Sequence, residues 1–172
     1  MTRQLVGLQQ QVLGEPVEAV VSSLRHAIVA APGKRLLAGD YSGVQARIVL
    51  ALAGQHDKTA VMASGKDVYL DMAEAIYKVP AGTFNKHEHV EERQYGKNSV
   101  LGLGFQMGAR KFRARYAKDH PPEFAEGIVQ TYRKEWAPLV PKLWYALQDA
   151  AVRAVWDRKP CEAYGIRYQL EE

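Results

Sequence analysis

The chain has 172 residues with 47% hydrophobic and 24% charged residues, and its formal net charge is +4. These values are typical of an ordinary soluble domain that buries a core. The sequence contains no run of about 18 uncharged apolar residues, so it predicts no membrane span. Residues 1–13 lack the apolar stretch of a signal peptide. The single cysteine, Cys161, excludes an internal disulfide and a thiolate-cluster zinc site, and it fits a reducing, cytoplasmic environment.

The excess of positive charge is confined to one segment of the chain. Residues 1–92 carry 9 basic and 10 acidic side chains and residues 119–172 carry 7 and 9, whereas residues 93–118 carry 7 basic side chains and no acidic one. Such a block is typical of proteins that bind phosphates, and a solvated helix face explains it equally well. Four interleaved aromatic residues favour nucleic acid, because bases stack on such rings: Tyr95, Phe105, Phe112 and Tyr116.

The predicted elements begin with a short helix or turn over residues 14–25 and a β-hairpin. The apolar runs 27–30 and 35–39 are joined by Ala31, Pro32 and Gly33, which form a turn signal. Helical spacing of apolar residues then extends over 44–54 and 57–63. A further helix follows Asp67, its predicted N-cap, and ends before Pro80.

The second half of the chain is predicted to be almost entirely helical. The patterns predict helices over 88–105, 108–118, 123–136 and 138–158 and a terminal strand over 166–170. The predicted fold class is therefore α+β and mainly α-helical, with a short β-hairpin followed by a helical lobe.

Asp40 is the first candidate for chemistry. It ends the predicted strand 35–39 and is followed by Tyr41 and the first long helix. A carboxylate held there suits Mg²⁺, which prefers oxygen ligands together with substrate phosphates. An Asp in this position is more often a helix N-cap, so both interpretations stay open.

A second candidate is a stripe of side chains within the predicted helix 88–105. Arg93, Lys97, Leu101 and Phe105 follow each other at intervals of four and therefore share one helix face. Two cations one turn apart suit a polyphosphate, and the apolar turns beyond them suit a sugar or a base. The alternative is a surface helix whose Leu101 and Phe105 face the core.

Three glycines interrupt the same segment. Gly96, Gly102 and Gly104 each cost roughly 0.5–1 kcal/mol in a helix interior relative to alanine. Their presence predicts the close approach of another backbone or of a base pair, or a bend in the helix.

Taken in chain order, these stretches resemble the A-family DNA polymerases, the group of bacterial DNA polymerase I and many phage replicative enzymes. Residues 38–48 resemble motif A, and residues 93–105 resemble motif B, the nucleotide-binding helix of the fingers. Residues 65–77 are similar to the family's GxD-x-(H/Y) helix, and residues 25–32 to the Arg-containing strand before motif A. The Gly-rich form of motif B looks most like phage and prophage members.

The resemblance implies a DNA-directed DNA polymerase, a nucleotidyltransferase that adds dNTPs to a primer 3′-hydroxyl by two-metal-ion catalysis with Mg²⁺. Asp40 and the backbone carbonyl of Tyr41 would bind the metal. Arg93 and Lys97 would hold the triphosphate, and Lys97 would also act as a general acid toward the leaving pyrophosphate. The implied partners are primer-template DNA and dNTPs, in the cytoplasm of a bacterium or a phage-infected host.

Several implied nucleotide contacts depart from the family's usual residues. Gln45 replaces a Glu that helps to exclude the ribose 2′-hydroxyl, and Leu101 replaces an aromatic residue that packs on the sugar. Phe105, near the templating base, replaces a Tyr, and Gln106 replaces a Gly. Basic side chains complete the predicted site as DNA contacts: Arg25, Arg110, Lys111, Arg113 and Arg115.

The resemblance also predicts the domain organisation. Residues 1–42 would be a partial palm with the motif A strand, residues 43–137 a helical fingers subdomain, and residues 138–172 a helix and strand returning toward the palm. The family's His-Asp-Glu strand, with its second catalytic carboxylate, has no counterpart after residue 118, and His56-Asp57-Lys58 lies in a helical pattern between motifs A and B.

We therefore expect a fingers-centred piece of a larger polymerase that is inactive by itself. Exposed strand edges of a truncated palm would favour a homodimer. The alternative is a non-enzymatic, helical nucleic-acid-binding module, which would not need Asp40 to bind Mn²⁺ together with a nucleotide.

Overall fold

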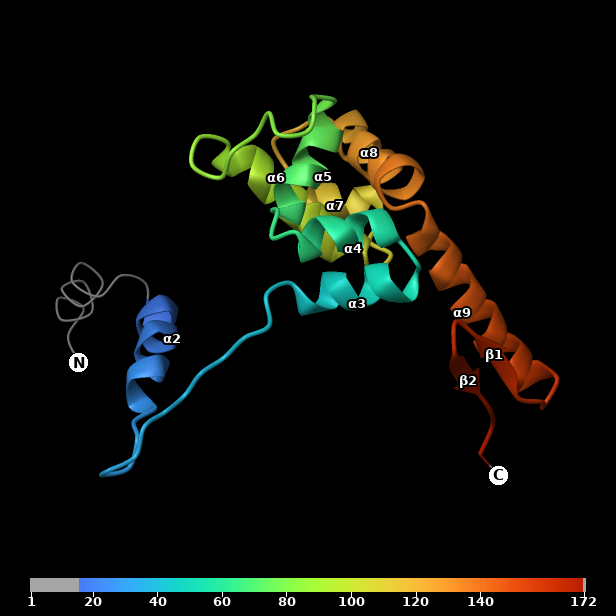
Figure 1. Ribbon diagram of the computed structural model, residues 1–172, viewed down its shortest axis with the longest axis horizontal. Helices are drawn as coiled ribbons and strands as arrows, with labels where there is room; N and C mark the ends of the chain where they lie inside the picture. Colours follow the sequence, from blue (N-terminus) through green and yellow to red (C-terminus); the bar gives the residue numbers. More distant parts are fainter. Residues whose placement is uncertain (1–15, 172) are drawn as a thin grey trace. The chain divides into compact units, whose positions relative to one another are not determined.

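The computed structural model describes residues 16–171, and the chain divides into two units, Met1–Tyr41 and Ser42–Glu172. The described part of the first unit holds one helix, α2 (Pro16–Ala27), so the segment predicted as a short helix or turn over 14–25 is a helix (Figure 1). Arg25, expected in a strand, lies in α2, and its side chain is outside the described part of the structure.

The predicted β-hairpin over residues 27–39 is wrong. The turn itself forms, because Lys34 N donates to Ala31 O at 2.9 Å and Gly33 has a φ of 72°. Residues 28–41 contain no strand, and the side chain of Leu37 is 95% exposed. A two-stranded hairpin is marginal in water without a third strand or a covering helix. The strand edges expected to support a homodimer are therefore absent from residues 28–41.

The second unit is a helical lobe. The predicted helices all form, with ends that differ by a few residues. In chain order they are α3 (Val44–Leu52), α4 (His56–Ala63), α5 (Val68–Tyr77), α6 (Val90–Leu103), α7 (Ala109–Tyr116), α8 (Pro122–Gln130) and α9 (Leu139–Trp156). The segment predicted as one helix over 123–136 changes to a π-helix, η1 (Thr131–Trp136), after α8. Among residues 16–171 no helix combines the length and apolar character that a membrane crossing requires.

The only sheet among the described residues lies near the C-terminus. Strand β1 (Cys161–Ala163) pairs antiparallel with β2 (Ile166–Tyr168), and Figure 1 shows both strands beside the C-terminal part of α9. The turn residues Tyr164 and Gly165 have φ values of 52° and 73°, as a type I′ hairpin requires. The predicted terminal strand is thus confirmed, and the mainly helical α+β class is confirmed with its sheet here instead of at residues 27–39.

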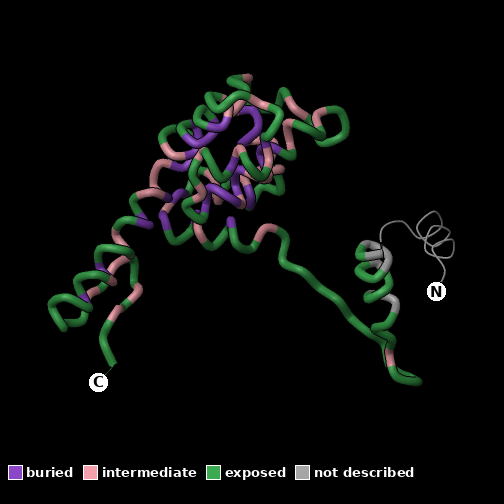
Figure 2. Tube along the Cα trace, turned by 180° about the vertical axis from the view of Figure 1, so that it is seen from behind, coloured by how far each residue is buried: buried purple, intermediate pink, exposed green. Residues whose placement is uncertain are grey.

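The core of the second unit is formed by side chains of all its helices from α3 to α9 (Figure 2). Its largest fully buried side chains include Met72 on α5, Leu103 on α6, Phe112 on α7 and Tyr132 on η1. Because these elements are far apart in sequence, the core fixes α6 against both its neighbours and the C-terminal helices.

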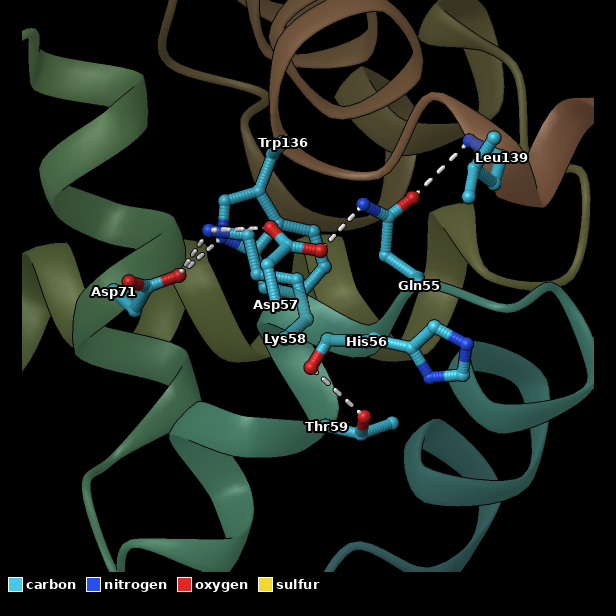
Figure 3. A network of polar contacts seen from close by, with 8 residues as sticks. All are labelled: Gln55, His56, Asp57, Lys58, Thr59, Asp71, Trp136 and Leu139. Atoms are coloured by element: carbon cyan, nitrogen blue, oxygen red, sulfur yellow. Dashed lines mark hydrogen bonds and ion pairs between the residues drawn. The ribbon is translucent and has the colours of Figure 1, made fainter.

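A polar network ties α4 and α5 to the C-terminal helices (Figure 3). The Asp71 carboxylate accepts hydrogen bonds from Lys58 Nζ at 2.9 Å and from Trp136 Nε1 at 2.6 Å. Gln55 donates to Asp57 at 2.6 Å and accepts from Leu139 N at 3.1 Å. The residues of the His56-Asp57-Lys58 triplet therefore lie on a helix and belong to a packing network.

Helix α6 approaches α5 through Gly96. A Cβ atom built on Gly96 would lie 2.0 Å from the backbone oxygen of Tyr69 and 3.0 Å from Ala73 N. No side chain fits in that space, so the close approach of another backbone predicted from the glycines is confirmed at Gly96. Gly102 instead packs against the Met107 side chain, whose sulfur lies 3.2 Å from the position of a Cβ.

Replacing Gly96 with alanine is expected to lower the free energy of unfolding by about 1–3 kcal/mol or more, because α5 and α6 must move apart. Urea unfolding followed by circular dichroism measures this change. Gly127→Ala is the matched control, since nothing lies within 4 Å of its Cβ position in α8. That control is expected to stabilise the helix by about 0.5–1 kcal/mol, and equal effects of the two substitutions would contradict the packing argument.

Candidate nucleotide-binding site

The candidate site is built on the face of α6 that the core leaves open. Tyr95, Gly96, Ser99, Val100 and Leu103 are buried against the neighbouring helices. The stripe at intervals of four starts on another face of α6, where its first three side chains are half-buried. The fourth, Phe105, lies in the turn after α6 and is 58% exposed. The alternative of a helix with a core-facing Leu101 and Phe105 is wrong, because neither residue belongs to the core.

Arg93 is held firmly at the start of this stripe. Its Nε atom lies 2.7 Å from Asp67 Oδ2, and its guanidinium lies 5.3 Å from the centre of the Tyr69 ring. The other carboxylate oxygen, Asp67 Oδ1, accepts a hydrogen bond from Tyr69 N at 3.0 Å and caps α5, which confirms the predicted N-cap. The first turn of α5 thus holds the Asp67 carboxylate in place, and that carboxylate holds the arginine on α6.

A pocket of about 240 Å³ lies beside Arg93, between the first residues of α3, the end of α4 and the start of α5. Three basic side chains line it, Arg47, Lys66 and Arg93, against the single carboxylate of Asp67. Arg47 is oriented by a hydrogen bond from its Nε to Ser42 O at 3.0 Å. This arrangement suits an anion, because guanidinium groups donate hydrogen bonds to phosphate oxygens in pairs. We call it the α5–α6 pocket.

The structure brings together only some of the predicted site residues. Lys97 and Arg93 are one turn apart on α6, and Lys97 has no hydrogen bond or ion pair within residues 16–171. Gln45 is exposed on α3. Asp40 and Tyr41 belong to the first unit, and both side chains are exposed. Their grouping with α6 stays a prediction.

A second depression, of about 350 Å³, lies between the end of α6 and α7 and is called the α6–α7 groove. Phe105, Lys111, Arg115 and Tyr116 line it, and the Arg115 guanidinium lies 5.4 Å from the centre of the Tyr116 ring. The groove thus combines aromatic rings with cations, as surfaces that bind single-stranded nucleic acid do.

Two of the aromatic residues that favoured nucleic acid lie in the core instead. Tyr95 is 9% exposed and Phe112 is fully buried, so neither ring can stack on a base. Burial raises the pKa of the Tyr95 hydroxyl, and the nearby charges of Glu91 and Asp119 act in the same direction. Among the predicted DNA contacts, Arg110 is exposed, whereas Arg113 donates from Nε to His120 O at 2.8 Å and so orders the chain after α7.

The segment after α6 is fixed by side chains from the C-terminal helices. Trp144 Nε1 donates to Gly104 O at 3.0 Å, and Arg133 donates from Nη2 to Met107 O at 3.2 Å. The Arg133 guanidinium lies 5.6 Å from the centre of the Trp144 ring. Between these two contacts, Gln106 has a φ of 63°, in the left-handed region that favours glycine.

The described residues do not fit a pair of Mg²⁺ ions. Within residues 16–171 no three His, Cys, Asp or Glu side chains are grouped so that they could hold a metal ion. Asp40 provides one carboxylate, whereas each Mg²⁺ requires nearly octahedral oxygen coordination.

Comparison with known proteins shows which proteins the chain is similar to. No family model matches it. The chain is 30% identical over 160 residues to a DNA polymerase of Bacillus phage SP02, an alignment that covers 90% of the chain and 24% of the phage protein. It is also 28% identical over 86 residues to DNA polymerase I of Chloroflexus aurantiacus, which covers 50% of the chain and 9% of that protein. The chain is thus related to DNA polymerases.

More specifically, this similarity supports the resemblance to the A family of these enzymes that the motifs indicated. The aligned residues span about a quarter of the length of the phage polymerase and about a tenth of the bacterial one.

Sequence reasoning missed three side chains of the α5–α6 pocket. Asp67 was predicted only as a helix cap, and Arg47 and Lys66 were assigned no role. The signal was present in the resemblance, because Asp67 and Tyr69 fall in the GxD-x-(H/Y) helix. The contact between Asp67 and Arg93 joins positions 26 residues apart, and this distance cannot be read from one sequence.

Gln106→Gly is expected to stabilise the protein by about 0.5–1 kcal/mol. The left-handed conformation costs a side-chain-bearing residue roughly 1–2 kcal/mol, and the larger entropy of glycine in the unfolded chain offsets part of the gain. Thermal and urea unfolding measure the effect. Gln148→Gly, at an exposed site within α9, is the control and is expected to cost about 1 kcal/mol. Destabilisation by both substitutions would show that the Gln106 side chain outweighs its backbone strain.

Proposed function

We propose that the second unit of this chain binds the incoming dNTP of a template-directed DNA polymerase. The observation that carries the proposal is the open face of α6, where two cations are followed by a half-buried Leu101 and an exposed Phe105. A polyphosphate, a sugar and a base occur in the same order along a nucleotide. The relationship to DNA polymerases supports this orientation of the ligand.

Arg93 and Lys97 bind the triphosphate in this proposal. Arg93 contributes a planar donor group that pairs with phosphate oxygens, and Lys97 contributes a point charge one turn further along α6. As pyrophosphate leaves, Lys97 donates a proton to it as a general acid. Gln45 and Leu101 take the places near the sugar, and Phe105 lies near the templating base.

The α6–α7 groove is the proposed surface for DNA, next to the nucleotide site. Its exposed cations, Lys111 and Arg115, are placed to contact phosphates, and the rings of Phe105 and Tyr116 offer surfaces on which bases stack. Arg110 adds charge at the start of α7. Primer-template DNA is therefore the proposed macromolecular partner.

In the same proposal residues 1–42 are part of a palm and residues 43–137 are the fingers, with residues 138–172 returning toward the palm. Asp40 and the backbone carbonyl of Tyr41 are then the metal-binding groups of the palm. Because Asp40 supplies one carboxylate only, a complete metal site needs a further carboxylate from other residues.

Arg93→Ala combined with Lys97→Ala is expected to weaken binding of dATP at least about ten-fold, because hydrogen bonds between charged partners are lost. Isothermal titration calorimetry at low and at moderate salt measures the change, and the wild-type affinity is expected to fall with salt. Lys142→Ala combined with Arg153→Ala on α9 is the matched control, since it removes the same two residue types from exposed positions.

An equal loss of affinity in both double variants would mean that only net charge matters, and it would refute the proposed site. Circular dichroism confirms that each variant is folded before the comparison is made.

The pure 172-residue chain is expected not to extend a primer with either Mg²⁺ or Mn²⁺, because one carboxylate cannot position two metal ions. A gel assay with a labelled primer-template and all four dNTPs tests this, and an intact A-family polymerase is the positive control. Robust extension by the chain alone would overturn the expectation.

A further inference from the structure

We infer that Asp67 is a positioning residue, which orients the guanidinium of Arg93 for the phosphates of a bound nucleotide. The inference rests on the proposed function and adds to it a residue that makes no contact with the nucleotide itself. It follows from the way the two carboxylate oxygens of Asp67 are divided between different partners.

The geometry leaves the phosphate-binding end of Arg93 free. Asp67 Oδ2 accepts from Nε, the inner nitrogen of the guanidinium, at 2.7 Å. Within residues 16–171 the two terminal nitrogens, Nη1 and Nη2, have no hydrogen-bond partner. The side chain lines the α5–α6 pocket together with Arg47 and Lys66. A carboxylate that pairs with Nε thus fixes the plane of the group and leaves both terminal amino groups for an anion.

Asp67 can act in this way because its own position is fixed. Its other oxygen accepts the hydrogen bond of Tyr69 N at 3.0 Å, so the carboxylate cannot rotate without loss of the α5 cap. The Tyr69 ring lies against the Arg93 guanidinium, with 5.3 Å from its centre to Cζ. Carboxylate and ring together hold a side chain that otherwise has several rotatable bonds.

The approach of the two helices makes this contact reachable. Gly96 is one turn beyond Arg93 on α6, and it lies directly against the Tyr69 backbone. The side chains of Asp67 and Arg93 are both partly buried, with 24% and 31% of their surface exposed. The pair is therefore less screened by solvent than the exposed pair Lys78–Glu135, in which both side chains are 59% exposed.

Asp67→Asn separates the two roles of the residue. The amide oxygen still caps α5, whereas the amide nitrogen cannot accept the hydrogen bond of Arg93 Nε. We expect affinity for dATP to fall about three- to ten-fold, because the free Arg93 side chain must be ordered when the nucleotide binds. Calorimetric titration with dATP, and with inorganic tripolyphosphate as a probe without sugar or base, measures the loss.

A double-variant cycle shows whether the effect passes through Arg93. In the Arg93→Ala background, Asp67→Asn is expected to cause no further loss of affinity. A readout that needs no ligand is the exchange of the Arg93 Nε proton with water, followed by NMR. It is expected to be slow in the wild type and faster in Asp67→Asn. Glu135→Gln, which breaks the Lys78–Glu135 pair, is the matched control and is expected to change neither quantity.

Two sets of outcomes distinguish this inference from the proposed function. If the wild type binds neither dATP nor tripolyphosphate, the proposed function fails. If the wild type binds and Asp67→Asn binds equally well or more tightly, the positioning role alone is overturned. An equal loss in the wild-type and Arg93→Ala backgrounds would also overturn it, because the carboxylate would then act on the fold and not on Arg93.

Discussion

The close approach of α5 and α6 at Gly96 is the constraint on which the site depends. A methyl group there would meet the backbone oxygen of Tyr69 at 2.0 Å, so the two helices are in backbone contact. That contact brings Arg93 within reach of Asp67, the N-cap of α5. It also orients the side of α6 with Val100 and Leu103 toward the core and leaves the cationic face open.

Most of the helical lobe could be predicted from the sequence, because its signals are local. The cap at Asp67 and the apolar spacing of the helices depend only on neighbouring residues. The hairpin over residues 27–39 could not be predicted in this way, since its apolar runs form strands only when other strands or helices cover them. Tyr164 and Gly165 gave too weak a turn signal to reveal β1.

The candidate site was predictable as a face but not as a pocket. Spacing by four residues identified the stripe from Arg93 to Phe105, and none of its residues belongs to the core, although α6 ends before Phe105. Counting charges along residues 93–118 found no acid, yet Asp67 compensates Arg93 from 26 positions away. The aromatic residues noted in the same segment could not be sorted by burial: Tyr116 lines a groove, whereas Phe112 is buried. Periodicity predicts which side chains share a face of one helix. Contacts between helices decide which of them are buried and which line a pocket.

The contacts of Trp144 and Arg133 also change the electric field at the end of α6. The last carbonyl groups of a helix carry a partial negative charge, which repels an approaching phosphate. Here the indole N–H donates to Gly104 O, the carbonyl of the α6 C-cap, and the guanidinium donates to Met107 O in the loop that follows, next to the α6–α7 groove. The donors come from η1 and α9, and the last turn of α6 has no basic residue of its own. The C-terminal helices therefore mask the negative pole of α6 at the place where a polyanion would pass.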